Sequence, residues 1–157
     1  MMAPALRVLI IDGHPAVGRG LKALVGEMPG LHVVGLATRG ERGLAQAAEV
    51  TPDVALVDAD MPGLCSEAVV RLLRARLPAA RIVALGIYPE RKWTLLQAGA
   101  HEFVLKDAGY EALRVAIVAP SGGGSDDPEV GVVVATSART ASTAGSVGPM
   151  AYEERVL

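Results

Sequence analysis

Two kinds of segment alternate along the first 119 residues. Short runs rich in Val, Ile, Leu and Ala predict buried strands, and longer segments with apolar residues at helical spacing predict amphipathic helices. The predicted strands span residues 7–11, 32–37, 54–57, 81–85 and 102–105. The predicted helices span residues 15–28, 39–50, 64–77, 90–98 and 110–119. Strand–helix units repeated in this way are typical of an α/β protein with a parallel sheet.

The sequence changes character after Ala119. Residues 120–125 read Pro-Ser-Gly-Gly-Gly-Ser, a composition typical of a flexible linker. Residues 127–134 favour either a short helix, because Asp-Pro suits a helix start, or an edge strand, because three consecutive valines follow. We therefore divide the chain into a domain over residues 1–119, a linker over 120–147 and a terminal segment over 148–157.

Composition narrows the classes of protein that this chain can represent. Hydrophobic residues make up 51% of it and aromatic residues only 3%, so we expect a sizeable core built from aliphatic side chains. A formal net charge of -2 excludes a basic nucleic-acid surface spread over the whole chain. Cys65 is the single cysteine, so no internal disulfide can form, and no Cys/His spacing indicates a zinc site.

Other features point to the cytoplasm. The chain does not begin with a signal-peptide pattern, and no run approaches the ~20 apolar residues that a membrane helix needs. We therefore expect a soluble cytoplasmic protein that makes no contact with membranes. Its Cys65 thiol is expected to be buried or half-buried, and His32 and His101 are expected at the surface.

Charged residues follow three of the five predicted strands: Asp12, Asp58 and Lys106. Glycines stand beside them, Gly13 directly after Asp12 and Gly86 after the fourth strand. In an open parallel sheet, the carboxyl ends of the strands form the usual ligand crevice, so the two carboxylates and the lysine should converge there. Such carboxylates can hold Mg²⁺, and a lysine can neutralise a phosphoryl group. The alternative is an ion-pair network that only caps the sheet.

Several stretches together resemble a known family. They are residues 8–15 (Val-Leu-Ile-Ile-Asp-Gly-His-Pro), 52–58, 61–63 (Met-Pro-Gly) and 99–107. At this spacing they resemble the receiver domain of bacterial two-component response regulators of the NarL/FixJ type, over roughly residues 6–119. The resemblance implies a flavodoxin-like (βα)5 fold with strand order 2-1-3-4-5. It also implies a signalling protein rather than an enzyme, with Asp58 at the phosphoacceptor position.

The sequence departs from the family pattern at two positions in the site. Gly13 stands where the family has a second carboxylate that binds Mg²⁺, and Gly86 stands where it has a Thr or Ser hydroxyl. Lys106 is retained, and Phe103 matches an aromatic position that often changes rotamer on activation. A lost metal ligand should lower metal affinity at least about 10–100-fold, the range known for outer-shell changes.

These departures set the expected chemistry. We expect Mg²⁺ binding to be weak or absent and expect no resident cofactor; Asp12 and Asp58 would be the ligands of any metal. Asp60, two residues after Asp58, is a candidate substitute for the missing carboxylate. Without a metal, Lys106 can pair directly with Asp58 or Asp12 and hold the domain in one state.

Three functional hypotheses follow. The first is an atypical receiver of a transcriptional regulator that acts without Mg²⁺-dependent aspartyl phosphorylation. The second is a working phosphoacceptor receiver that uses Asp58, with Asp60 compensating for Gly13. The third is a small-molecule-binding regulatory module, in which Gly13 and Gly86 make room for a ligand.

The expected partners follow from the same resemblance. We expect a homodimer, and a sensor kinase or a small-molecule ligand as the input. An exposed Trp93 would favour a protein interface on the fourth helix. Residues 148–157 resemble the opening of the helix-turn-helix output domain that follows such receivers. DNA binding would then need an output domain that is missing from this chain.

Overall fold

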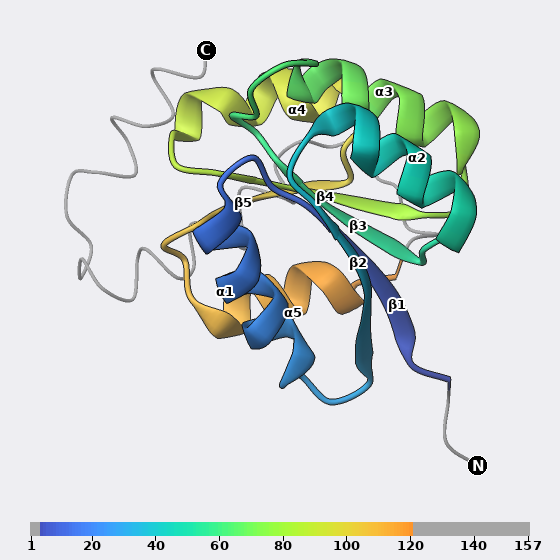
Figure 1. Cartoon of the computed structure of the whole chain (residues 1–157). Helices are drawn as coiled ribbons and strands as arrows, with labels where there is room; N and C mark the ends of the chain where they lie inside the picture. Colours follow the sequence, from blue (N-terminus) through green and yellow to red (C-terminus); the bar gives the residue numbers. More distant parts are fainter. Residues whose placement is uncertain (1–3, 121–157) are drawn as a thin grey trace, which may run out of the picture.

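The computed structural model describes residues 4–120, which form one five-stranded parallel sheet with helices on both faces (Figure 1). The strand order is β2-β1-β3-β4-β5, as the resemblance implied, and confirms the flavodoxin-like fold. Apart from Pro120, the proposed linker, its helix or strand, and the terminal segment 148–157 lie outside the described residues. Within residues 4–120, no helix is both long enough and apolar enough to cross a membrane.

The elements follow the predicted order closely. The strands are β1 (Leu6–Ile11), β2 (Leu31–Ala37), β3 (Val54–Asp58), β4 (Arg81–Gly86) and β5 (Glu102–Leu105). The helices are α1 (Pro15–Gly26), α2 (Gly40–Val50), α3 (Ser66–Arg76), α4 (Lys92–Ala98) and α5 (Tyr110–Val118), with a short 3-10 helix, η1 (Pro89–Arg91), before α4.

Local sequence explains several of the element ends. Pro15 occupies the first turn of α1, where its missing N–H costs nothing. Helix α1 ends at Gly26, two residues earlier than predicted, and the chain turns through Gly30, whose φ of 80° suits glycine. The predicted helix over 90–98 is instead η1 followed by α4, because Pro89 begins a tighter 3-10 turn.

Two separate hydrophobic clusters pack on the two faces of the sheet. One lies beneath α2, α3 and α4, and the other beneath α1 and α5. Strands β3 and β4 are buried along their whole length, which explains the apolar runs over residues 54–57 and 82–85. The core is aliphatic, as predicted, and Phe103 is the only aromatic side chain among its fully buried residues within the described chain.

Two predictions of side-chain exposure were wrong: Cys65 was expected to be buried or half-buried, and His101 was expected at the surface. Cys65 is exposed, because it lies just before α3 in the loop that follows β3. His101 is partly buried between α3 and β4: its Nδ1 accepts a hydrogen bond of 3.0 Å from the Ile82 amide, and its Nε2 faces Arg74. Burial and the charges of Arg74 and Arg81 lower the pKa of His101 to about 4, so the ring is neutral at pH 7.

Candidate functional site

The strand register brings the predicted polar residues together at the carboxyl edge of the sheet. Ile11 of β1 pairs with Val57 of β3, so the next residues, Asp12 and Asp58, are neighbours. On the other side, Gly86 pairs with Leu105, and Lys106 follows directly. We call Asp12, Asp58 and Lys106 the acidic site. The sequence predicted this convergence from parallel-strand geometry alone.

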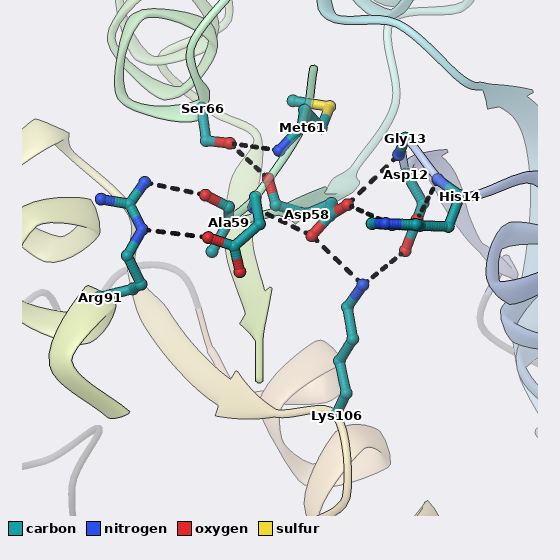
Figure 2. Close-up of polar contacts among 10 residues, drawn as sticks. Asp12, Gly13, His14, Asp58, Ala59, Met61, Ser66, Arg91 and Lys106 are labelled. Carbon is teal, nitrogen blue, oxygen red and sulfur yellow. Dashed lines mark hydrogen bonds and ion pairs between the residues drawn. The ribbon is translucent and has the colours of Figure 1, made fainter. Parts of the chain in front are cut away.

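Lys106 bridges the two carboxylates. Its Nζ lies 3.0 Å from Asp12 Oδ2 and 3.2 Å from Asp58 Oδ1 (Figure 2). Asp12 and Asp58 are each only 1% exposed, and the Lys106 side chain is 16% exposed. Two carboxylates facing one ammonium leave the site with a formal charge of minus one. Because the carboxylates are buried, each charge would be costly without the opposite charge beside it.

Backbone amides hold the Asp58 carboxylate in place. Its Oδ1 accepts a hydrogen bond from the Asp60 amide (3.1 Å), and its Oδ2 accepts one from the Gly13 amide (3.3 Å). Burial on its own would raise the pKa of Asp58. The Asp60 amide and the Lys106 ammonium outweigh burial, so the pKa lies below its ordinary value. Asp58 is therefore ionised at neutral pH.

Ser66 fixes the main chain around Asp58. Its hydroxyl donates a hydrogen bond of 2.7 Å to the Asp58 carbonyl and accepts one of 3.4 Å from the Met61 amide. The same serine is the first residue of α3, so it ties the end of β3 to the start of that helix. This role was not predicted, because a lone serine at a helix start gives no signal for a contact eight residues away.

His14 stands beside both carboxylates, on the side away from Lys106. Its Nδ1 lies 3.4 Å from Asp58 Oδ2 and 3.6 Å from Asp12 Oδ1, and its backbone amide donates a 2.8 Å hydrogen bond to Asp12 Oδ1 (Figure 2). The side chain is 55% exposed, so one part of the ring meets solvent. The position of this imidazole beside both aspartates was not predicted from the sequence.

Asp60 lies next to the acidic site, but its side chain is directed elsewhere. Its Oδ1 lies 3.4 Å from Arg91 Nε. Arg91 Nη2 donates a hydrogen bond of 2.8 Å to the Ala59 carbonyl (Figure 2). Arg91 also forms a 2.7 Å ion pair with Glu67 of α3. Arg91 therefore ties η1 to the β3–α3 loop and holds the Asp60 carboxylate away from Asp12 and Asp58.

The two glycines are closely packed, so neither opens space in the site. A Cβ added at Gly13 would collide with the Pro62 ring, and one added at Gly86 would lie 2.7 Å from Cζ of Phe103. Phe103 is 1% exposed, so its ring is held inside the domain beside Gly86. Both neighbours fill the volume that a larger residue would occupy.

The residues present fit a resident Mg²⁺ poorly. Magnesium prefers near-octahedral oxygen ligands, whereas Gly13 offers no side-chain oxygen. The Lys106 ammonium already occupies one oxygen of each carboxylate, and a nitrogen ligand, His14 Nδ1, faces the other two. Asp60 could contribute a third carboxylate only by leaving Arg91.

A doubly wound sheet in this order, with paired aspartates and a lysine at its carboxyl edge, defines a flavodoxin-like α/β domain with a polar site at the strand ends. Comparison with protein families then identifies the class. Residues 8–118 match the response regulator receiver domain, and the chain belongs to that family.

Individual relatives agree with this assignment. The chain is 36% identical over 124 residues to the transcriptional regulatory protein MctR of Rhizobium johnstonii, covering 78% of this chain and 58% of the relative. It is 36% identical over 112 residues to the nitrate/nitrite response regulator NarL of Escherichia coli, covering 70% and 52%. The chain thus spans little more than half the length of these curated relatives. A NarL/FixJ-type receiver is confirmed.

A solved structure supports the fold directly. The signal receiver domain of a NarL response regulator from Mycobacterium tuberculosis superimposes with a TM-score of 0.66 at 29% identity. The match covers 73% of this chain and 98% of that one. The match therefore extends over nearly all of that receiver domain.

Proposed function

We propose that this chain is the receiver part of a transcriptional regulator and that it signals without Mg²⁺-dependent phosphorylation of Asp58. The observation that carries the proposal is the acidic site itself: two buried carboxylates bridged by one lysine, with no carboxylate at position 13. Relatives named as transcriptional and response regulators support the regulatory part. They are signalling proteins, which speaks against an enzyme.

Charge explains why phosphoryl transfer is disfavoured here. A transferring phosphoryl group brings negative oxygens toward Asp12 and Asp58, and catalysis of this step depends on positive charge that neutralises them. Lys106 supplies one positive charge and is already shared by two carboxylates. With a poor Mg²⁺ site, phosphorylation would bring a further anion into a site whose formal charge is already minus one.

The region that would respond to a phosphoryl group is also altered. Gly86, at the end of β4, has no hydroxyl to contact phosphoryl oxygens. The ring of Phe103 fills the neighbouring space and is buried. The aromatic residue is therefore held in one position by packing, which supports a receiver with a fixed signalling state.

An exposed apolar patch offers a route for regulation by association. Ile87, Tyr88 and Trp93 are 59%, 57% and 42% exposed on the segment from β4 to α4. Exposed aromatic side chains grouped in this way are typical of protein interfaces. We propose that this patch, which we call the β4–α4 patch, mediates homodimer formation. DNA binding would belong to a part of the regulator outside residues 4–120.

The direct test is intact-protein mass spectrometry after incubation with acetyl phosphate and Mg²⁺. We expect no phosphate adduct on the wild-type chain. An adduct that is lost in Asp58→Asn would overturn the proposal and establish Asp58 as a phosphoacceptor.

A gain-of-function pair provides the positive control. Gly13→Asp restores the missing carboxylate, and Pro62→Ala removes the ring that its Cβ would meet. We expect the double variant, but not Pro62→Ala alone, to acquire an adduct that depends on Asp58. If the wild type and the double variant are labelled equally, the absence of a carboxylate at position 13 does not limit phosphorylation.

A further inference from the structure

The segment that joins β4 to α4 continues beyond the edge of the sheet. The pairing of β4 with β5 ends at Gly86, and the next two side chains, Ile87 and Tyr88, are exposed. Gly86 has no side chain with which to hold them. Contacts made further along the chain must therefore fix the position of the β4–α4 patch.

The main chain of Arg91 connects the two aromatic residues of the patch. Its amide donates a hydrogen bond of 3.1 Å to the Tyr88 carbonyl, which closes the turn of η1. Its carbonyl accepts a hydrogen bond of 3.0 Å from the Thr94 hydroxyl in α4. Trp93 follows Arg91 by two residues in the same helix. A displacement of Arg91 would therefore move Tyr88 and Trp93 with it.

The Arg91 side chain anchors this turn to the neighbouring strand and helix. Its Nη2 donates a hydrogen bond of 2.8 Å to the Ala59 carbonyl, directly after β3 (Figure 2). The same nitrogen forms a 2.7 Å ion pair with Glu67 Oε1 of α3. The side chains of Arg91 and Glu67 are 32% and 16% exposed, so water only partly screens the pair. Such charge-assisted contacts are stronger than neutral hydrogen bonds.

Asp60 contributes less to this anchor than Glu67 does. Its Oδ1 lies 3.4 Å from Arg91 Nε, a distance at which the two form an ion pair but no hydrogen bond. Its Oδ2 is buried and has no hydrogen-bond partner within residues 4–120. We therefore expect the Ala59 carbonyl and the Glu67 carboxylate to supply most of the anchoring.

We propose that Arg91 is a positioning residue for the β4–α4 patch: it ties η1 to the end of β3 and to α3, and so holds the patch in the arrangement that a second copy of the chain binds. The inference rests on the proposed function, because it takes the patch to be the homodimer interface. Arg91 acts by raising the population of molecules whose patch is already ordered. A symmetric dimer needs that arrangement in both protomers, so its loss affects the dissociation constant twice.

The first test is sedimentation velocity of the full chain over a concentration series. Arg91→Gln removes the charge and should raise the dimer dissociation constant at least about fivefold, because fewer molecules have an ordered patch. Glu67→Gln changes a residue of α3 outside the patch and should produce a similar increase, whereas Asp60→Asn should produce a smaller one. The double variant Arg91→Gln/Glu67→Gln should differ little from Arg91→Gln, because both changes remove the same ion pair.

Arg114 provides the matched control. It also pairs with a glutamate, Glu111, at 2.6 Å, but within α5. Arg114→Gln should leave the dimer dissociation constant unchanged. An equal rise in Arg114→Gln and Arg91→Gln would overturn the inference, because loss of any positive charge would then weaken association.

The second test observes the patch in the monomer. Trp93 is the only tryptophan of the chain, so its fluorescence reports on the patch alone. At concentrations where the proteins are monomeric, acrylamide should quench Trp93 more efficiently in Arg91→Gln and Glu67→Gln than in the wild type, because release of η1 exposes more of the ring. Equal quenching in all three proteins would overturn the positioning role, even if the dissociation constant changes.

The two proposals fail in different ways. If the wild type forms no dimer, or if Trp93→Ser leaves self-association unchanged, the proposed homodimer interface is refuted, and quenching of Trp93 still decides whether Arg91 orders the patch. If the patch forms the dimer but Arg91→Gln changes neither quenching nor association, only the positioning role is refuted. Far-UV circular dichroism checks that each variant is folded. If Arg91→Gln does not fold, Glu67→Gln, which keeps the size of its side chain, provides the same test.

Discussion

The ring of Phe103 lies against Gly86, in the volume that any side chain at position 86 would need. A Cβ built on Gly86 would be 2.7 Å from Cζ and 2.8 Å from Cε2 of that ring, and 3.2 Å from the Ala59 Cβ. Glycine at the end of β4 and a buried aromatic residue in β5 are therefore two parts of one packing arrangement.

Gly86→Ala should reveal this packing. The added methyl group would overpack the core and lower the free energy of unfolding by about 1–3 kcal/mol. Phe103→Leu replaces the ring with a smaller side chain, so Gly86→Ala should lower the free energy of unfolding less in that background. The expected coupling in a double-mutant cycle is roughly 0.5–3 kcal/mol. Urea unfolding measures all four proteins. A stabilised Gly86→Ala, as expected for an unhindered glycine, would contradict the packing argument.

The bridge from Lys106 predicts a second effect on stability. Lys106→Met keeps the apolar stem but takes away the one ammonium that pairs with the buried carboxylates of Asp12 and Asp58. Removing one member of a buried ion pair costs about 3–5 kcal/mol, and we expect a value near the lower end because the lysine is partly exposed. Chemical denaturation at pH 7 measures the loss.

The control for Lys106→Met removes the charges of its two partners, Asp12 and Asp58. In an Asp12→Asn/Asp58→Asn background no carboxylate needs the ammonium, so Lys106→Met should have a much smaller effect on the unfolding free energy. An equal loss in both backgrounds would mean that the lysine stabilises the domain by packing of its stem and not by charge.

His101 predicts how stability depends on pH. Its pKa is about 4 in the folded protein and about 6.5 in the unfolded chain, so the unfolded state binds more protons between these values. The resulting stabilisation is complete above pH 6.5 and is lost as pH falls toward 4. Thermal unfolding between pH 7.5 and 4.5 should show this decline.

A comparison of variants isolates the histidine. Burial raises the pKa of Glu102 despite its Arg81 partner, and this works in the opposite direction to His101. His101→Asn keeps an acceptor for the Ile82 amide but cannot titrate, so its stability should fall less than that of the wild type over the same pH interval. His32→Asn, at an exposed site, should retain the wild-type pH profile. Identical profiles for His101→Asn and wild type would assign the pH dependence to other groups.

The β4–α4 patch predicts how the chain self-associates. Trp93→Ser should raise the dimer dissociation constant at least about tenfold, because a buried tryptophan at an interface commonly contributes 2 kcal/mol or more. Sedimentation velocity over a concentration series measures it. Val17→Ser, an equally exposed apolar residue on α1, serves as the matched control. If Val17→Ser, and not Trp93→Ser, raises the dimer dissociation constant, the interface lies on the other face of the sheet.

Much of the acidic site could be anticipated from the sequence. Asp12, Asp58 and Lys106 each follow or end an apolar run, and parallel strands bring such positions to one edge. The side-chain arrangement could not. Asp60 lies two residues from Asp58, yet Arg91, which is 31 residues further along the chain, determines where its carboxylate is directed.

His14 is the reverse case of Asp60: it was not predicted to contact the acidic site, yet it lies beside both aspartates. A histidine followed by proline gives no local sign that its ring will lie beside two aspartates, since its contacts depend on how the turn after β1 meets the end of β3. Gly13 and Gly86 were read as room for a ligand in one hypothesis. Packing of Pro62 and Phe103 fills that room, because close packing leaves few voids in a protein interior.

By itself the sequence determined the strand–helix order, the aliphatic core and the identity of the charges at the strand ends, because hydrophobic periodicity and strand direction are local properties of the chain. Only the tertiary structure decided which of those charges pair, which aspartate faces the site and which ring fills the space beside a glycine. Those outcomes depend on distances between residues far apart in the chain, and these are set when the helices pack onto the sheet.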